Sequence, residues 1–589
     1  MGVFCQKPGT GARVLLLTPP FVQLNTPYPA TAQLTGWLRR HGVAAAQRDL
    51  SIEVALDVLR ACGEQPLTDE VIAFLQGRNP DDAETLAEPG YLPEGPSFAE
   101  LDNTPYDPDP RERALLRCSL YLDDLAAAIR DEVDPDFGFS RYAERLGVSV
   151  PDFGAVLRRL RRRGAVDRLL EARTEEALRA AFGRRRKGLY VGVTCPFPGT
   201  LVGAFRIART VRRLLPEATL VLGGGYVNTE LRAMDDPRVR RFFDVVMYDE
   251  GYAPWSRLLG LPSAEPPPFV APSYEGLDLA QYIDLAETAN PMQRLWSNGR
   301  WLKLQLARGC YWHKCAFCDV TLDYIRCFAM PRPAEIVDAM QRLAAETGET
   351  GFHFTDEAIP PALARGVAEE ILRRRFACRW WGNVRFDASY TPALARLMAK
   401  AGCVAVTGGL ECANDRLLKL MNKGITLASA RRALASFADA GILVHAYLMY
   451  GFPTQTAAEA ESALRYVRDR FREGTIRSAF FHRFALTVHS PIAREPAKFG
   501  IELADGKRRG AGRTFARNEI AYAEPGAPDW DRLGQGLKLA LYNYMLGLGL
   551  DKPASYWLKV IGQRLGAVSR GTCLPTATRS SEISRRRGV

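Results

Sequence analysis

Three cysteines lie close together in the run RGCYWHKCAFCD. Four residues separate Cys310 from Cys315, and two separate Cys315 from Cys318. Thiolates are the preferred ligands of zinc and of iron–sulfur clusters, so cysteines this close on one loop can converge on a soft-metal site. A structural zinc ion would need a fourth ligand, which His313 or Cys327 could supply. Three thiolates on a four-iron cluster would instead leave one iron open to bind substrate.

The remaining cysteines, the composition and the charge limit the class of protein. Nine of the 12 cysteines are scattered singly along 589 residues, which is typical of buried thiols in a reducing compartment. We find no apolar run of about 18–20 residues and no signal-peptide layout at the start, so we expect a cytoplasmic protein without a membrane span. The net charge of +11 sits largely in short arginine runs without an aromatic-interleaved groove, so nucleic acid is not an expected partner.

The cysteine run follows a predicted strand that opens a series of strand–helix units. From Trp301 the pattern LKLQLARG, GFHFTDE, WWGNVRFD, VAVTGGLE, ILVHAYLMYGFP and SAFFHRFAL gives six predicted strands, each of the first five followed by a helical pattern. Six units in about 200 residues predict an open or partial barrel, because a full eight-unit barrel takes about 250. We assign residues 301–501 to this partial (β/α)6 barrel.

A second α/β unit precedes the barrel. The runs ARVLLLTPPF, GLYVGVTC, TLVLGGGY and DVVMYDEG read as buried strands that alternate with helices, which predicts a doubly wound, Rossmann-like parallel sheet over residues 1–270. Residues 51–187 interrupt it as a mainly helical insertion. The stretch around LPSAEPPPFVAPSYEG suggests a linker, placed at 271–300, and residues 502–589 read as a C-terminal helical region with a basic tail.

The three close cysteines after the first strand, the aromatic Phe317 just before the third, and the partial barrel that follows resemble the radical S-adenosylmethionine superfamily. The resemblance implies that Cys310, Cys315 and Cys318 bind a [4Fe–4S] cluster whose open iron chelates S-adenosylmethionine, which is then cleaved to a 5′-deoxyadenosyl radical. The family usually has three residues between its first two cysteines, whereas this chain has four.

The resemblance extends along the barrel and implies further S-adenosylmethionine contacts. Carboxylates at the end of the second strand would hold the amino group, although a helix-capping Asp is the alternative reading. An arginine in the third unit could pair a carboxylate or form a structural ion pair. The implied cofactor-binding residues are Phe317, Asp356, Glu357, Arg385, Gly408, Gly409, Glu411, Gly451 and Pro453.

A doubly wound domain before such a barrel is similar to the cobalamin-binding subclass. The runs RVLLLTPPF, VGVTCPFPGTL, LVLGGGYVNTE and VVMYDEGYAPWSRLL occur in the order that this subclass shows. The resemblance implies a cobalamin cleft at Thr194, Cys195, Gly223, Gly224 and Gly225, with glycine allowing close approach of the macrocycle. The D-x-H-x-x-G signature is absent, so cobalamin would bind without histidine ligation, or the domain is vestigial and binds none.

The resemblance favours a cobalamin-dependent radical enzyme that methylates an unactivated carbon of a peptide or natural-product substrate. It implies a one-electron reductant such as flavodoxin or ferredoxin as partner. Radical cyclisation, rearrangement or methylthiotransfer with a vestigial cobalamin domain is the alternative. The isolated Cys5, Cys62, Cys118 and Cys195 do not obviously supply the three extra cysteines that methylthiotransfer uses. A hypothesis of another class is a non-catalytic protein with a structural metal at the cysteine loop.

Overall fold

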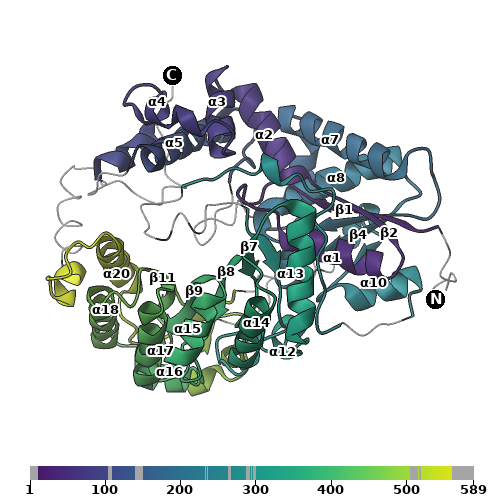
Figure 1. Cartoon of the computed structure of the whole chain (residues 1–589). Helices are drawn as coiled ribbons and strands as arrows, with labels where there is room; N and C mark the ends of the chain where they lie inside the picture. The colour runs from purple at the N-terminus through teal and green to yellow at the C-terminus, as the bar shows by residue number, and fades with distance from the viewer. Residues whose placement is uncertain are drawn as a thin grey trace.

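A computed structural model describes most of the chain (Figure 1). The residues it describes are 11–103, 109–139, 150–232, 234, 236–262, 267–286, 292, 295, 300–504, 515 and 519–559. The predicted basic tail, part of the predicted linker and two stretches of the predicted insertion lie outside these residues. No helix within the described ranges is long and apolar enough to cross a membrane.

The N-terminal unit is built on a parallel sheet of five strands in the order β2-β1-β3-β4-β5. Alternate residues of the first strand, RVLLLT, face opposite sides of the sheet. Leu15 and Leu17 pack into one hydrophobic cluster, and Val14 and Leu16 pack into another. Both faces are therefore covered, as a doubly wound sheet requires. The elements are β1 (Arg13–Thr18), α1 (Pro29–Arg40), β2 (Ala44–Asp49), β3 (Leu189–Thr194), η3 (Pro198–Thr200), α8 (Leu201–Leu214), β4 (Thr219–Gly223), α9 (Gly225–Asn228), η4 (Pro237–Arg241), β5 (Val245–Val246) and α10 (Tyr252–Leu259).

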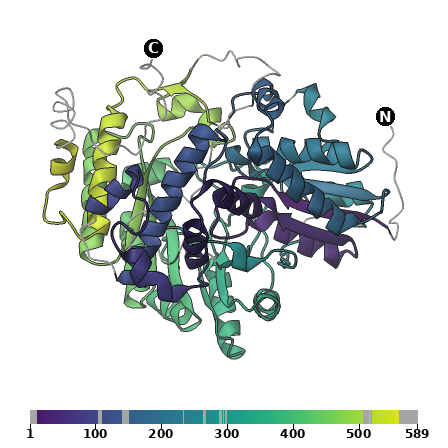
Figure 2. The same ribbon diagram turned by 90° about the horizontal axis from the view of Figure 1, so that it is seen from above.

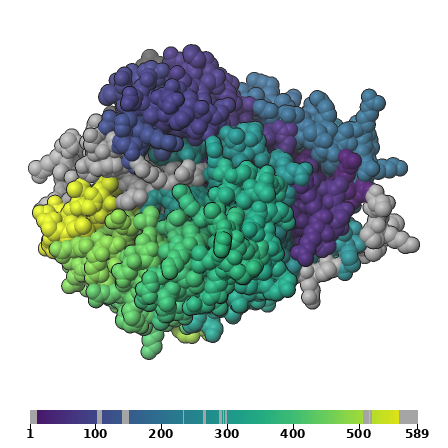
Figure 3. All heavy atoms as spheres, in the orientation of Figure 1, coloured from purple at the N-terminus to yellow at the C-terminus, as the bar shows by residue number. Residues whose placement is uncertain are grey.

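The described residues between β2 and β3 form helices and turns, as the sequence predicts. In the view from above, this insertion lies across the boundary between the two sheets (Figure 2), and in the space-filling view it forms the upper layer of the molecule (Figure 3). Its elements are α2 (Leu50–Cys62), α3 (Leu67–Leu75), η1 (Pro80–Asp82), α4 (Ala83–Ala87), η2 (Pro96–Asn103), α5 (Pro110–Glu132), α6 (Phe153–Arg161) and α7 (Ala165–Phe182).

The second unit is a parallel sheet of six strands in the order β11-β10-β9-β8-β7-β6, which confirms the six predicted strands. Leu302, Leu304, Phe352 and Phe354 face the surrounding helices and form its core. The first and last strands are not paired with each other, so the barrel is open. Its elements are β6 (Leu302–Leu304), α12 (Asp323–Arg326), α13 (Pro333–Thr347), β7 (Gly351–Phe354), α14 (Pro361–Arg373), β8 (Arg379–Val384), α15 (Pro392–Lys400), β9 (Cys403–Glu411), α16 (Asp415–Leu420), α17 (Leu427–Asp439), β10 (Leu443–Tyr450), α18 (Ala457–Arg472) and β11 (Ser478–Arg483).

The C-terminal region packs onto the barrel. Helix α20 (Trp530–Met545) lies against α18 and β11, and its Trp530, Leu537 and Tyr544 belong to the same core as the barrel strands. The remaining elements are η5 (Leu279–Gln281), α19 (Pro491–Arg494), η6 (Pro496–Phe499), β12 (Glu502–Leu503) and β13 (Tyr522–Ala523), the last two forming an antiparallel pair.

The described part of the predicted linker is packed between the two units. The amide of Ser273 donates to the carbonyl of Ala32 in α1, and the Tyr282 hydroxyl donates to the carboxylate of Asp49 over 2.7 Å. Tyr282 is buried. The hydroxyl of Tyr274 donates to the carbonyl of Lys303 in β6 over 3.2 Å, so the segment ties the barrel to the N-terminal sheet through specific hydrogen bonds.

Candidate active site

The cysteine loop lies at the carboxyl end of β6, where parallel α/β sheets place their ligands. Cys315 is buried, whereas Cys310 and Cys318 are partly exposed. The Cys310 amide donates to the carbonyl of Ile325, and the amide of Ala316 donates to the carbonyl of Met421 in the loop after α16. The loop is thus held from two sides while two of its thiols remain accessible.

Charges around the loop favour a thiolate at Cys315. The Cys318 thiol donates to the sulfur of Cys315, and this hydrogen bond, with the nearby cations of Lys423 and Arg385, lowers the pKa of Cys315 to about 6 against the opposing effect of burial. The same bond raises the pKa of Cys318. A thiolate is the form that binds metal.

The donor set suits an iron–sulfur cluster in its chemistry. Three thiols lie on one loop, and the cations of Lys423 and Arg385 lie near enough to offset the negative charge of a thiolate-bound cluster. In the part of the chain that the structure describes, no group of three or more His, Cys, Asp or Glu side chains is arranged around a single metal ion. A polynuclear cluster requires no such convergence, because each of its cysteines binds a different iron. His313 is exposed, and its Nδ1 lies 2.9 Å from the carbonyl oxygen of Cys310.

An indole ring from the segment between the first two cysteines packs against the loop after α16. Trp312 Nε1 donates to the carbonyl of Asn422 over 2.8 Å, and the ring rests on Gly424, where any Cβ would overlap it. The guanidinium of Arg385 lies 4.6 Å from the centre of the same ring. Arg385 is buried and also donates to the carbonyl of Lys423. The loop is therefore docked on the segment 422–424 by stacking as well as by hydrogen bonds.

Glu411 lies in a buried ion pair beside the cysteines. Lys423 Nζ is 2.5 Å from Glu411 Oε1, and the ammonium also lies 5.7 Å from the centre of the Phe317 ring. Burial works against the charge on Lys423, but Glu411 and Cys315 raise its pKa overall. A Cβ on Gly409 would overlap the carboxylate of Glu411, and one on Gly408 would press on Phe386. Phe317, Gly409 and Glu411 are thus brought together near Cys315, whereas Gly408 faces Phe386 in the hydrophobic core.

The two carboxylates after β7 have different environments. Asp356 is fully buried, and its oxygens accept hydrogen bonds from the amides of Leu306 and Ala307 at 2.9 and 2.7 Å. Burial nevertheless raises its pKa to about 7. Glu357 is an exposed residue in a crowded part of the surface. Desolvation of its carboxyl by the surrounding protein, together with the negative charge of Asp319, raises its pKa to about 7. Of the two, Glu357 is the exposed one, whereas Asp356 holds the start of the cysteine loop.

The turn after β10 is enclosed by the C-terminal region. Gly451 has a φ of +73°, its amide donates to the side chain of Gln455 over 2.7 Å, and Trp530 of α20 covers it. Pro453 is buried. The structure therefore places these two residues at the same carboxyl edge of the sheet, with the backbone of Gly451 already engaged by Gln455.

The loops after β3 and β4 lie side by side in the N-terminal unit. The amide of Cys195 donates to the carbonyl of Gly223 over 2.6 Å, and that of Tyr226 donates to the carbonyl of Cys195. Gly224 has a φ of +114°, and a Cβ there would come within 2.6 Å of the Cys195 backbone. The close approach that Gly224 permits is therefore to Cys195 of the same chain. Gly225 begins α9, next to the hydroxyl of Tyr28.

The side chains at this edge of the N-terminal sheet differ in their hydrogen bonding. The Cys195 thiol is fully buried and pairs with the hydroxyl of Thr200 at 3.2 Å, so it faces the protein interior. The hydroxyls of Thr18 and Thr194, at the ends of β1 and β3, are buried without a hydrogen-bond partner in the described residues. Unpaired buried hydroxyls call for a ligand or water, so this edge fits a polar cofactor.

Two functional contacts were missed from the sequence. Lys423, the partner of Glu411, stands in LMNKG, where a lysine after a short helix gives no signal of its own. Arg308 Nε lies 2.7 and 2.6 Å from the carboxylate oxygens of Glu250, so the cysteine loop is joined to the loop after β5. The one signal for this contact in the sequence was the opposite charge of Arg308, in the run RGC, and Glu250, in the run YDEG.

Comparison with known proteins yields three findings besides a family match. Residues 304–467 match the model of the Radical SAM superfamily. An anaerobic magnesium-protoporphyrin IX monomethyl ester cyclase of Rubrivivax gelatinosus is 28% identical over 226 residues, 37% of this chain and 38% of that protein. An uncharacterized methyltransferase of Pyrococcus horikoshii is 22% identical over 303 residues, 47% of this chain and 63% of that protein. The chain thus matches less than two thirds of the length of either relative.

The third finding concerns a solved structure. The radical S-adenosylmethionine methyltransferase TsrM of Kitasatospora setae, with tryptophan substrate and an S-adenosylmethionine analogue bound, superimposes with a TM-score of 0.50 at 15% identity. The match covers 95% of this chain and 100% of that chain. At this identity the likeness concerns the fold, and it extends over both sheets.

Proposed function

We propose that the chain is a cobalamin-dependent methyltransferase acting on an unactivated carbon, because residues 304–467 match the model of the Radical SAM superfamily. The observation that carries the proposal is the triad of Cys310, Cys315 and Cys318 at the carboxyl edge of one parallel sheet, joined by the Arg308–Glu250 ion pair to the matching edge of a second. When bound, the cluster and cobalamin would supply one-electron chemistry and a transferable methyl group.

The residues around the cysteines would bind and orient S-adenosylmethionine. Its ammonium group is positively charged, so a carboxylate at the mouth is the fitting partner, and Glu357 presents one. Glu411 is neutralised by Lys423, so its free oxygen suits a hydroxyl donor better than a second cation. The aromatic rings of Phe317 and Trp312 shield this region from water.

The loops after β1, β3 and β4 would hold cobalamin. Thr18 and Thr194 offer buried hydroxyls, and the backbone of Gly223 to Gly225 forms the neighbouring wall. His41, the one histidine before position 313 in the sequence, lies at the end of α1 with its Nδ1 held by the carbonyl of Trp37. Cobalamin would therefore be held without a histidine ligand.

Metal and cofactor content test this proposal. Protein purified without oxygen, from cells supplied with hydroxocobalamin, should contain about four irons and one cobalamin per chain. Cys315→Ala should lose the iron, whereas Cys378→Ala, which changes a half-buried cysteine away from the loop, should keep it. A Cys315→Ala protein with full iron content would contradict the proposal.

A radical cyclisation is the second candidate, favoured by the similarity to a cyclase. The two reactions differ in what happens to the methyl group. Methyl transfer consumes S-adenosylmethionine as methyl donor and releases S-adenosylhomocysteine, whereas a cyclisation does not. Release of 5′-deoxyadenosine without any S-adenosylhomocysteine in extracts of the native host would favour the cyclase. The substrate class, a small molecule or peptide, and a flavodoxin-like or ferredoxin-like reductant remain parts of the proposal.

A further inference from the structure

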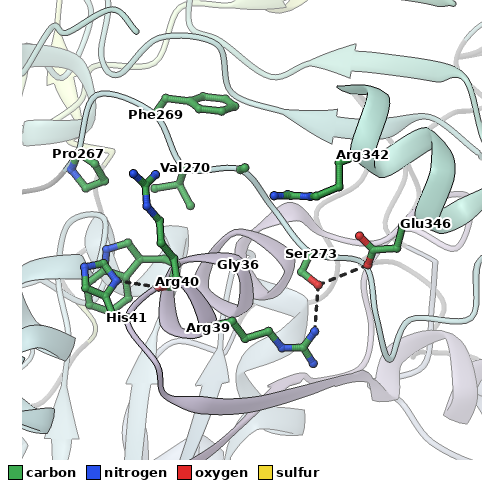
Figure 4. Close-up of a pocket in the computed structure, with 12 residues that line it drawn as sticks. Gly36, Arg39, Arg40, His41, Pro267, Phe269, Val270, Ser273, Arg342 and Glu346 are labelled. Atoms are coloured by element: carbon green, nitrogen blue, oxygen red, sulfur yellow. Dashed lines mark hydrogen bonds between the residues drawn. The ribbon is translucent and has the colours of Figure 1, made fainter. Parts of the chain in front are cut away.

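A cavity of about 610 Å³ lies between the two units, away from the cysteine loop. It is lined by the end of α1, by residues 267–273 and by the second half of α13 (Figure 4). These ends of the helices precede β2 and β7, so the cavity lies at the amino ends of the strands. The cysteines and the glycine loop lie at the carboxyl ends, so the cavity is separate from the candidate active site.

Two arginines of this cavity have no carboxylate partner in the described part of the chain. Figure 4 shows Arg342 reaching from α13 across the cavity and Arg40 rising from α1 beside Val270. Arg342 donates one hydrogen bond, of 2.9 Å, to the carbonyl of Pro272, which leaves most of its guanidinium donors free. Arg40 makes no hydrogen bond or ion pair with any described residue. Arg39 differs, because Ala45, Ser273 and Glu275 take up its donors.

The cavity also contains one carboxylate, Glu346. Its Oε1 accepts from the amide of Glu275 at 3.0 Å and lies 3.5 Å from the hydroxyl of Ser273. Glu346 is thus satisfied by neutral donors and does not neutralise Arg40 or Arg342. The unpaired charges at the cavity, two arginines against one glutamate, leave a net positive charge.

The floor of the cavity is apolar and fixed in place. Trp37, Phe269 and Val270 are at least nine-tenths buried and present apolar surface at the base. Segment 271–273 is fastened to α1, because Ser273 donates its amide to Ala32 and because Gly36 has no Cβ to hold the carbonyl of Ala271 away. The cavity is therefore formed before any ligand arrives, and its volume suits a molecule of metabolite or cofactor size.

We propose that this cavity binds an organic anion, a molecule with a carboxylate or phosphate head for Arg40 and Arg342 and an apolar body for the floor. Guanidinium groups pair these heads through charge-assisted, often bidentate hydrogen bonds. Because one arginine comes from α1 and the other from α13, the ligand bridges the two units. The binding does not depend on the proposed methyl transfer.

Calorimetric titration of the full chain tests the site with three probes. Phenyl phosphate and isophthalate carry the two candidate heads on the same ring, and benzyl alcohol is the neutral control. At least one anion should bind with one site per chain, and benzyl alcohol should not. Whichever anion binds more tightly identifies the head group as phosphate or carboxylate. Absence of binding by both anions at millimolar concentration would overturn the proposal, even if an acidic peptide bound instead.

Four variants locate the binding. Arg40→Gln and Arg342→Gln should each weaken it about tenfold or more, because each removes a charged hydrogen bond. Glu346→Gln should tighten it, because it removes a like charge. Arg40 and Arg342 are themselves exposed, so Arg365→Gln, which makes the same charge change at an exposed position of α14 outside the cavity, is the matched control and should have no effect. Unchanged affinity in both cavity-arginine variants would overturn the proposal. Cys315→Ala should bind as the native chain does, which separates this site from the proposed function.

Discussion

Arg308 and Glu250 form the ion pair that joins the cysteine loop to the N-terminal sheet, with N–O distances of 2.7 and 2.6 Å. Both side chains are about 85% buried, with exposed fractions of 16% and 15%. Arg308 is also held by two backbone hydrogen bonds to Ala329. The position of the first cysteine, two residues further on, therefore depends on the N-terminal unit.

Breaking this pair should destabilise the chain and loosen the coupling of its two cofactor sites. We expect Glu250→Gln and Arg308→Gln each to lower the free energy of unfolding by about 1–3 kcal/mol, since each leaves a charge without its partner. The double variant should cost less than the sum of the two. Denaturant unfolding in a double-mutant cycle measures this, and strictly additive effects would contradict a direct interaction.

The contact of Trp312 with Gly424 can be tested at a single glycine. Gly424→Ala should destabilise the chain for two reasons, the φ of +75° at this position and the overlap of the new Cβ with the indole. We expect the free energy of unfolding to fall by about 2–4 kcal/mol in total. Gly441→Ala is the matched control, because Gly441 has a φ of +77° with open space around it. Thermal unfolding and iron content compare the two. Equal losses in both variants would mean that the indole contact contributes nothing.

The cation at Lys423 should control the reactivity of Cys315. In cluster-free protein, alkylation of Cys315 by iodoacetamide should reach half its maximal rate near pH 6, the pKa that the thiol has beside Cys318, Lys423 and Arg385. Lys423→Met removes a cation that favours the thiolate, so this midpoint should move to higher pH. Lys423→Arg keeps the charge and should largely restore it. Lys419→Met, at an exposed lysine of α16, should leave the profile unchanged, and a midpoint equal in all variants would contradict the assignment.

Lys303 should make stability depend on pH. It is buried on the inward side of β6, next to His353, and burial lowers its pKa to about 7. Between pH 7 and about 10.5 this lysine carries a proton in the unfolded state but not in the folded state. Its burial therefore lowers the free energy of unfolding by the full amount below pH 7, and this loss disappears as the pH rises to 10.5. Lys303→Met should therefore stabilise the chain by about 4 kcal/mol near neutral pH.

That advantage should shrink toward pH 10, because the folded-state lysine is then neutral and the unfolded-state lysine is beginning to lose its proton. Denaturant unfolding of the native chain and of Lys303→Met at pH 7 and pH 10 measures the difference. Lys400→Met, at the exposed end of α15, serves as the control, because its effect should be small at both pH values. A stabilisation by Lys303→Met that is equal at pH 7 and pH 10 would contradict the lowered pKa.

The parts that could be predicted from the sequence are those with local signals. Each barrel strand is a short apolar run, and the first five precede amphipathic helices, so the six strands and their order along the chain were predictable. The cysteine loop was equally visible, because its residues are close in sequence. The division of the chain at residues 270, 300 and 501 stays a prediction, although α20 shares the barrel core.

The parts that could not be predicted depend on residues far apart in the chain. Trp312 meets Asn422 across 110 positions, and Arg308 meets Glu250 across 58. The spacing of hydrophobic residues along the sequence does not indicate such contacts, because they depend on how the loops pack once the sheets have formed. The role of Asp356 shows the same limit, because a carboxylate at a strand end looks alike whether it faces a ligand or binds the amides of Leu306 and Ala307.

The place of the helical insertion has a consequence for how such chains can diverge. Strand β1 pairs with both β2 and β3, so the insertion leaves and re-enters the sheet at strands that flank the same neighbour. The helices at its ends, α2, α6 and α7, pack on this sheet or on α8 and share its core, so the insertion is fixed at both ends. Evolution can therefore lengthen or shorten the segment between α2 and α6 while the register of the sheet is inherited unchanged.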